Sequence, residues 1–466
     1  MRKTLFLLLF CLFTLVFTGR ALAIESPISS PNNKFGIHIT DLSDLEDAAK
    51  LVNSSGGDWG YVTFVIQKTN RNTKSWQSIF DKCRRLHLIP IVRIATRAQG
   101  DIWEKPSLGD IDGWISFLES LNWVIKNRYV VIGNEPNHAK EWGGEVNPEE
   151  YTDYLISFSS KLRAASEDFY ILPAGLDSSA PNSKETMDEY LFLKRMYNKN
   201  NAFLSYIDAW SSHSYPNPGF SASENDSGRT SIRNFYWEKS ILKEFGLVND
   251  LAIFITETGW AHKVTPDDKK LLESNLLGQK YKNAFENAWS DQNIVAVTPF
   301  VLTYKEPPFL QFSWRDPNNG FYSFYNDVQS IKKTQGIPIQ IDKAEISAFY
   351  VFPYQLSGAS YSGLFLVKNI GQTIWNITDF SLHSKDGVNP AITTSSFSEL
   401  EPGNIGFISF KGISGIESES RLHSVILYRN KTPVSQKYTF HLITISPFKM
   451  KFEALWGRIY SYFKSF

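Results

Sequence analysis

The chain has 466 residues, too many for one ordinary domain of about 100–200 residues, and its hydrophobic (42%) and charged (21%) fractions exclude an unfolded chain or one embedded throughout in a membrane. The formal net charge is zero, but residues 1–23 carry +3 and residues 446–466 carry +3, which leaves −6 on the body between them. A mildly acidic body without a basic cluster argues against nucleic acid as a partner.

The first residues have the pattern of an export signal over residues 1–23. Arg2 and Lys3 precede an apolar run over 5–17, and small residues ending at Ala23 offer a cleavage site. The run is shorter than the roughly 20 apolar residues of a membrane-spanning helix, although an uncleaved anchor is an alternative. We therefore expect a protein that is secreted or displayed on the extracytoplasmic cell surface.

Between residues 33 and 335, short apolar runs alternate with helical segments. Eight runs are apolar on both faces, as buried parallel strands are: 34–39, 59–66, 88–95, 129–133, 170–176, 209–215, 252–257 and 294–302. Asn147, followed by Pro148 and two glutamates, is typical of a capped helix start. Eight strand–helix units in order predict an α/β fold of the (β/α)8 TIM barrel type. A doubly wound open sheet is the alternative, but no glycine-rich phosphate loop accompanies it.

Two glutamates stand at the ends of predicted strands. Glu135 follows the fourth strand in an Asn-Glu-Pro sequence, and Glu257 ends the seventh in Thr-Glu-Thr-Gly-Trp. Barrel active sites form at the C-terminal ends of the strands, so both carboxylates are expected to face one cleft. Hydrolysis of a glycosidic bond requires two carboxyl groups, one to protonate the departing oxygen and one to attack or to activate water. The alternative is that both are surface or salt-bridged glutamates.

The sequences at 134–136 and 256–260, three βα units apart, together resemble clan A of the glycoside hydrolases, and the resemblance covers the predicted barrel. These enzymes are (β/α)8 barrels that retain anomeric configuration. The resemblance implies that Glu135 is the acid/base, that Glu257 is the nucleophile of a covalent intermediate, and that Asn134 holds the sugar 2-hydroxyl. It also implies an enzyme that hydrolyses O-glycosyl compounds, with a β-linked oligo- or polysaccharide as substrate. A barrel that binds glycans without cleaving them is the alternative.

Further polar residues on the strands are expected to support these carboxylates. In the clan, a His or Tyr at the end of strand six hydrogen-bonds the nucleophile; His213 and Tyr215 share a strand face, so either could serve, and we favour Tyr215. Arg93 is a charge within an apolar strand and needs a carboxylate partner. Many clan members carry the supporting Arg on strand two, which here (59–66) has none. His38 either faces the barrel mouth or packs in the core.

Three tryptophans that follow strand ends are candidate platforms for sugar rings: Trp142, Trp260 and Trp314. The resemblance implies a Trp after strand eight, which residues 297–302 lack, so Trp314 would have to reach back into the cleft. Trp260 alternatively packs beneath the nucleophile. Residues 216–231, rich in Gly, Ser and Asn, are a candidate lid. No cluster has metal-ligand spacing and no nucleotide motif occurs, so neither a metal nor a cofactor is expected.

The last part of the chain has two different textures. Over 340–445, short β-rich runs alternate with turn residues, which predicts a small all-β sandwich. Residues 367–375, with Glu-Pro-Gly at 401–403, resemble the immunoglobulin-like domains that accompany extracellular enzymes, in which Trp375 is expected to lie in the core. The tail over 446–466 has large apolar residues at helical spacing with cations between them. Such a basic amphipathic helix predicts peripheral membrane contact, or else a terminal helix docked on the protein.

Overall fold

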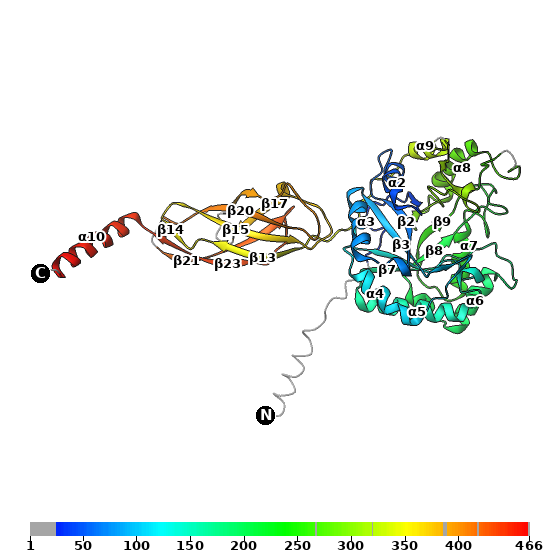
Figure 1. Ribbon diagram of the computed structural model, residues 1–466, viewed down its shortest axis with the longest axis horizontal. Helices are drawn as coiled ribbons and strands as arrows, with labels where there is room; N and C mark the ends of the chain where they lie inside the picture. The colour runs from blue at the N-terminus through cyan, green and yellow to red at the C-terminus, as the bar shows by residue number, and fades with distance from the viewer. Residues whose placement is uncertain (1–24, 266–267, 319, 385–388, 417–418, 465–466) are drawn as a thin grey trace, which may run out of the picture. The chain divides into compact units, whose positions relative to one another are not determined.

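The computed structural model describes residues 25–265, 268–318, 320–384, 389–416 and 419–464 (Figure 1). The export signal expected over residues 1–23 lies outside them. The described chain divides into two compact units, and the main division falls between Ile337 and Pro338. Two further segments, Thr73–Arg85 and Ser120–Lys126, associate with the second unit rather than the first.

The first unit contains two sheets in which every strand pair is parallel. One sheet follows the order β1-β2-β3-β6-β7 and the other β10-β9-β8. The bounds are β1 (Gly36–His38), β2 (Gly60–Gln67), β3 (Leu88–Ala95), β6 (Arg128–Ile132), β7 (Phe169–Pro173), β8 (Ala209–His213), β9 (Ala252–Glu257) and β10 (Ile294–Val297). The predicted parallel-stranded α/β architecture is confirmed, and β3 and β9 have the predicted bounds.

Isolated contacts lie between the ends of these two sheets. Phe35, beside β1, forms a parallel bridge with Val297, and Asp177, beyond β7, forms one with His213. The backbone N–H of His38 donates to the carbonyl of Pro299 at 3.0 Å. Among these eight strands, neighbours in space are therefore also consecutive in chain order, and β10 lies beside β1.

Helices lie around the strands of the first unit (Figure 1). Asn147 caps one of them as predicted, because its side-chain oxygen accepts from the backbone N–H of Glu150 at 3.1 Å and Pro148 follows it. The helices that follow the strands are α2 (Leu45–Val52), α3 (Thr73–Arg85), α4 (Ile111–Glu119), α5 (Pro148–Ala165), α6 (Glu189–Lys199), α7 (Asn234–Glu244), α8 (Leu277–Asn283) and α9 (Ser323–Ser330). Short strand pairs occur in the loops: β4 (Ala98–Gln99) with β5 (Ile102–Trp103), and β11 (Arg315–Asp316) with β12 (Gly320–Phe321).

Aromatic rings from both sheets meet in the core of the first unit. Phe254 of β9 lies 5.0 Å from Tyr129 of β6 and 6.4 Å from Tyr61 of β2, measured between ring centroids. Tyr170 of β7 lies 5.3 Å from Tyr129. These buried rings pack between the two sheets in the interior of the first unit.

The second unit consists of two sheets with a shared hydrophobic core. The sheets follow the orders β13-β15-β20-β18 and β14-β23-β21-β17, and β22 pairs with β21. The bounds are β13 (Ala344–Val351), β14 (Tyr354–Leu356), β15 (Ser360–Asn369), β17 (Phe380–Ser384), β18 (Ala391–Ser395), β20 (Ile405–Ile413), β21 (Ser420–Arg429), β22 (Thr432–Pro433) and β23 (Tyr438–Ile445). A short pair, β16 (Trp375–Asn376) with β19 (Glu399–Leu400), closes one end of the core.

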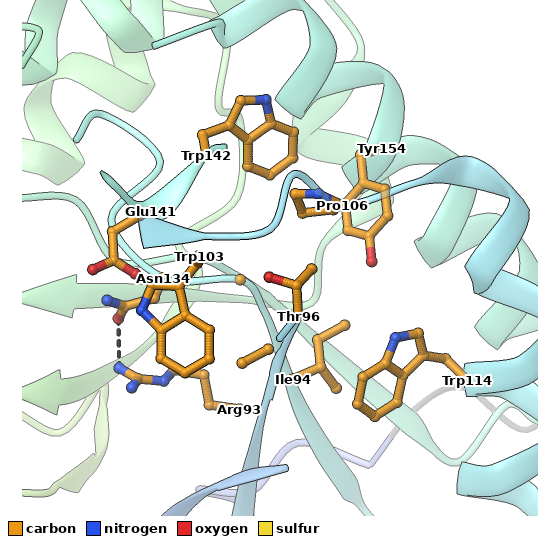
Figure 2. Close-up of a pocket in the computed structure, with 12 residues that line it drawn as sticks. Arg93, Ile94, Thr96, Trp103, Pro106, Trp114, Asn134, Glu141, Trp142 and Tyr154 are labelled. Carbon is orange, nitrogen blue, oxygen red and sulfur yellow. Dashed lines mark hydrogen bonds between the residues drawn. The ribbon is translucent and has the colours of Figure 1, made fainter. Parts of the chain in front are cut away.

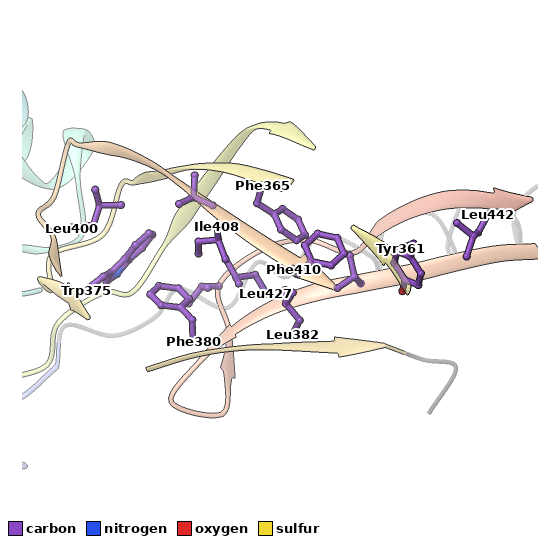
Figure 3. Close-up of a cluster of buried hydrophobic side chains, with 13 residues drawn as sticks. Tyr361, Phe365, Trp375, Phe380, Leu382, Leu400, Ile408, Phe410, Leu427 and Leu442 are labelled. Atoms are coloured by element: carbon purple, nitrogen blue, oxygen red, sulfur yellow. The ribbon is translucent and has the colours of Figure 1, made fainter. Parts of the chain in front are cut away.

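Both sheets of the second unit contribute to that core (Figure 3). Along β15 and β20 buried and exposed residues alternate, so that Phe365 and Phe410 face the interior. Leu427 of β21 meets them from the other sheet. Trp375 is fully buried there, which confirms that it is a core residue and not a sugar platform. After this unit comes α10 (Pro447–Lys464), the predicted tail helix.

Candidate active site

Charged side chains from four strands of the first unit meet at one edge. Arg93 comes from β3, Glu135 from the turn after β6, His213 from the last residue of β8, and Glu257 from the last residue of β9. One side-chain atom from each of Glu135, His213 and Glu257 lies within 4.8 Å of the other two. Parallel strands end at a common edge, and this is why residues far apart in the sequence converge here.

Glu135 stands on a backbone conformation that a glutamate rarely adopts. Its φ angle is 31° and that of Gly133 is 93°, and the backbone N–H of Glu135 donates to the carbonyl of Gly175 at 3.0 Å. Such strain outside glycine clusters at functional sites. The turn directs the side chain toward Nδ1 of His213, 2.8 Å away, and leaves 17% of it exposed to solvent.

Glu257 is a buried carboxylate surrounded by donors. Arg93 donates to its Oε1 at 2.5 Å, the Tyr215 hydroxyl donates to its Oε2 at 3.1 Å, and Nδ1 of His213 lies 3.8 Å from Oε2. Burial alone would raise the pKa of Glu257, but the charges of His213 and Arg93, with the hydrogen bond from Tyr215, outweigh it and lower the pKa to about 2. Glu257 is therefore ionised across the physiological pH range.

His213 lies between the two carboxyl groups. Burial favours its neutral form, but Glu257 and Glu135 outweigh that effect and raise the pKa of the imidazole. The ring fits against Gly175, where a Cβ atom would overlap it, so that position requires glycine. The imidazole thus contacts both carboxyl groups, at 2.8 Å from Glu135 and 3.8 Å from Glu257.

Arg93 has the carboxylate partner that its position in an apolar strand required. Its Nη1 also donates to Oδ1 of Asn134 at 2.5 Å. One guanidinium therefore links the residue before Glu135 to Glu257. This contact fixes the Asn134 amide with its oxygen toward Arg93, so its nitrogen is the donor group, which interacts with the carboxyl group of Glu141.

His38 does not reach the mouth of the site. The structure buries it completely, with its ring edge-on to Phe300 at 5.2 Å. Burial, followed by the charge of Arg93, lowers the pKa of His38 to about 3, so the imidazole is neutral. The expectation of a substrate-binding His38 is therefore corrected to a core residue beneath the site.

All three predicted aromatic platforms are buried, with Trp142 2% exposed. Trp260 and Trp314 are each only 1% exposed, and both rings pack on Tyr281, with centroids 5.1 and 4.8 Å away. Nε1 of Trp260 donates to the carbonyl of Ala222 at 2.9 Å, so the buried ring has no unpaired donor. The prediction that they present a face to sugar is wrong. The aromatic residue that follows β10 is Phe300, half-buried.

A small cavity of about 30 Å³ adjoins the cluster (Figure 2). Arg93 and Asn134 form its floor, and Trp142, almost fully buried against Tyr154, forms part of its wall. The remaining lining residues are Ile94, Ala95, Thr96, Trp103, Pro106, Trp114, Gly133 and Glu141.

Sequence reasoning missed two residues of this cavity. Trp103, in the short hairpin after β3, is half-buried and keeps part of its ring accessible, unlike Trp142. Glu141 brings a third carboxyl group, whose pKa burial and then Glu135 raise. Both follow strands that carry site residues, β3 and β6, and that position was the available signal.

Two larger hollows lie at the same strand ends. One of about 620 Å³ is lined by the loops after β7 and β8, including residues 178–181 and 217–219. The other, of about 240 Å³, is lined by Thr40, Asp41 and residues 303–306, after β1 and β10. Part of the predicted lid, 216–231, therefore forms a wall of the larger hollow.

The cluster also has the composition of a metal site, since Glu135, His213 and Glu257 offer one oxygen or nitrogen ligand each. Arg93, however, lies 2.5 Å from Glu257 and neutralises it. A second cation would be repelled by that guanidinium. The arrangement suits proton transfer and nucleophilic attack better than metal binding.

No family model and no curated protein matches this chain. Among solved structures, it is similar to a calcium-binding mutant of Bacteroides uniformis β-glucuronidase 2 (9% identity, TM-score 0.40, 89% of this chain and 46% of that one). It is also similar to a GH128 endo-β-1,3-glucanase from Sorangium cellulosum (12%, 0.40, 64% and 97%) and to AbfB, a family 51 α-L-arabinofuranosidase from Bifidobacterium longum (11%, 0.44, 83% and 97%). These neighbours are glycoside hydrolases; the chain spans less than half of the β-glucuronidase. At these scores the likenesses establish neither a family nor a substrate.

Proposed function

We propose that the chain is a retaining glycoside hydrolase that cleaves β-linked O-glycosidic bonds of an oligo- or polysaccharide. The observation that carries this proposal is the approach of Glu135 and Glu257, whose nearest oxygens lie within 4.8 Å. Carboxyl groups about 5–5.5 Å apart belong to retaining enzymes, whereas inverting enzymes need about 6.5–9.5 Å to admit a water. The separation leaves no room for that water.

The two carboxyl groups have different environments that suit different roles. Glu257, ionised by Arg93 and His213, attacks the anomeric carbon and forms an ester bond to it. Glu135, which reaches solvent, gives its proton to the glycosidic oxygen as the bond from that oxygen to the anomeric carbon breaks. Water then attacks the same carbon, Glu135 takes a proton from it, and Glu257 leaves as a carboxylate.

His213 supports both steps because it contacts both acids. Before attack its positive charge stabilises ionised Glu257; once Glu257 is esterified, the charge lies 2.8 Å from Glu135, which is now ionised. Tyr215 holds Oε2 of the nucleophile throughout. Asn134, fixed by Arg93, has an amide NH2 group with two hydrogens, one for Glu141 and one for the sugar 2-hydroxyl, whose hydrogen bond strengthens in the transition state.

The fold and location that we propose go with this activity. The bridges at Phe35 and Asp177 support closure of the eight strands into a (β/α)8 barrel. The two sheets around Trp375 support an immunoglobulin-like second domain. Export of the protein rests on the sequence of residues 1–23 alone. The two hollows lined by loops at the strand ends support a substrate longer than one sugar.

A panel of α- and β-linked glycans tests the proposal. We expect the wild type to release reducing ends from a β-linked member, and proton NMR to show the β anomer first. The double variant Glu135→Gln, Glu257→Gln should abolish the release of reducing ends. Glu145 is an exposed acid nearby, and the substitution Glu145→Gln should leave the release unchanged. Binding of a glycan without release would favour a glycan-binding barrel instead, and an inverted first product would contradict retention.

A further inference from the structure

The helix α10 carries large apolar side chains that face solvent. Phe452, Leu455, Trp456 and Tyr460 are each 57–66% exposed. The rings of Phe452 and Trp456 stack on each other, with centroids 6.1 Å apart, but cover little of one another's faces. A cluster of exposed aromatic residues of this size marks an interaction site and not a random surface.

These side chains gather on one side of the helix. Residues 452, 455, 456 and 459 follow the three- and four-residue spacing that places side chains on a single face. Gly457 and Ser461, both exposed, fall on the opposite side and carry little or no side chain. The helix therefore has a bulky apolar face and a small polar one.

The charge of the tail indicates which kind of partner binds the apolar face of α10. Residues 446–466 carry +3, from four cations against Glu453, whereas the body of the chain before them is acidic. Two copies of the helix facing each other would bring like charges together, whereas an anionic surface would attract them. Trp and Tyr rings, apolar with a polar tip, suit the boundary between lipid headgroups and acyl chains.

We propose that α10 lies in the interface of an anionic lipid bilayer, with Phe452, Leu455 and Trp456 buried at the headgroup boundary and Gly457 and Ser461 toward water. Among the described residues no helix has the length and apolarity to cross a bilayer. An amphipathic helix with aromatic and cationic residues lies in the plane of the interface. The inference is independent of the proposed hydrolase activity. It holds the protein at a membrane surface whether or not it cleaves glycans.

Flotation of the purified full chain with vesicles tests this. We expect binding to vesicles of phosphatidylcholine mixed with phosphatidylglycerol, weaker binding to phosphatidylcholine alone, and release by salt, since exposed charges are screened. Phe452→Ser with Trp456→Ser should lose binding, and the matched control, Gly457→Ala with Ser461→Ala, should retain it. Arg458→Gln with Lys464→Gln should weaken binding to the anionic vesicles alone.

Three results would overturn the proposal: no binding to anionic vesicles, equal binding by the Phe452→Ser, Trp456→Ser variant, or a dimer in solution that this variant abolishes in the absence of vesicles. The last result would make the face a contact between copies. Hydrolysis of soluble glycans, measured on the same preparations, should be unchanged by all these substitutions. Failure of membrane binding is therefore distinguishable from failure of the proposed activity.

Discussion

Two pairs of glutamates adjoin β8, and they differ in their neighbours. Glu135 and Glu257 lie at the strand end among Arg93, His213 and Tyr215. Glu189 of α6 and Glu238 of α7 lie beside each other, with Ser212 and Trp210 of β8 next to Glu238. Both of these are fully buried, and within the described chain their oxygens accept no hydrogen bond of ordinary geometry.

Burial raises the pKa of Glu257 as it raises that of Glu189 and Glu238, so the neighbouring cations account for the difference in pKa between them. At Glu257, Arg93 and His213 overcome burial, and the pKa falls to about 2. At Glu189, burial and then the neighbouring Glu238 raise the pKa, and the nearby Arg229 offsets only part of the rise. Two adjacent carboxyls whose nearby cations, Arg229 and His213, do not outweigh burial are stable when they share a proton. Charged neighbours, more than burial, separate a reactive carboxylate from a neutral one.

The largest effect should come from the acid beside the cations. Glu257→Gln removes the nucleophile, and we expect kcat to fall by about 10⁴-fold or more. Glu189→Gln removes an equally buried acid and should leave kcat within about twofold, because Glu189 lies on a helix away from the reacting carboxyl groups. Steady-state rates on the glycan identified by the panel check both. Similar losses of kcat in the two variants would contradict the different roles of Glu257 and Glu189.

Glu135→Gln should have a smaller effect that depends on the leaving group. General acid catalysis contributes about 10²–10⁴-fold, and a glycoside with an acidic phenol as leaving group does not need it. We expect a large loss on the natural glycan and a much smaller loss in the first step on such an aryl glycoside. Burst-phase kinetics separate the two steps. An equal loss on both substrates would argue against a proton-donor role.

Removal of the neighbouring cation Arg93 should raise the pKa of Glu257, as burial raises the pKa of Glu189 and Glu238. In Arg93→Met the pKa of Glu257 should rise, by about 1–3 for the loss of an adjacent charge. The acidic limb of the kcat/KM profile should then move to higher pH, because the nucleophile must be ionised. Arg93→Lys keeps the charge and should move the limb less. An unmoved limb in the Met variant would refute this account of Glu257.

The raised pKa of Glu238 should appear as a pH dependence of the free energy of unfolding. A carboxyl whose folded pKa is raised binds its proton more tightly in the folded state, so the free energy of unfolding falls as pH rises above the unfolded value of 4.5 and through the folded pKa. A pKa that differs by one between the folded and unfolded states corresponds to about 1.4 kcal/mol. Glu238→Gln should therefore gain in Tm over the wild type as pH increases. Melting curves across the pH range measure it; a constant difference would exclude a raised pKa.

The smallest effect concerns binding of the sugar ring. Trp103→Ala removes the half-buried ring beside Asn134, and we expect kcat/KM to fall about two- to tenfold, from an aromatic contact of roughly 0.5–1.5 kcal/mol. The exposed Trp456 gives the matched control, since Trp456→Ala lies outside the site and should leave kcat/KM unchanged. Equal effects of the two substitutions on kcat/KM would contradict the assignment of Trp103 to the site.

The parallel strands and the positions of Glu135 and Glu257 could be predicted from the sequence because their signals are local. β3 and β9 are continuous apolar runs, and a charge or polar residue at the end of such a run falls at the common strand edge. This logic places Arg93 and Glu257 together before any coordinates are known. Glu135 follows β6 in the same way.

What sequence could not supply depends on long-range packing. Trp260 and Trp314 follow strands as a platform would, but Tyr281 of α8 packs against both rings. Glu189 and Glu238 stand on helices, where a glutamate ordinarily faces water, so nothing local marks their burial. Trp103 lies in a two-stranded hairpin too short to be predicted from an alternating pattern.

Covalent trapping on Glu257 tests the central contrast most directly. The protein is incubated with an activated 2-fluoro glycoside of the sugar that it cleaves, digested and analysed by mass spectrometry. We expect one sugar mass on the peptide that contains Glu257, absent in Glu257→Gln and unaffected by Glu189→Gln. A label on another residue, or none from a glycoside whose natural counterpart is hydrolysed, would contradict the role assigned to Glu257.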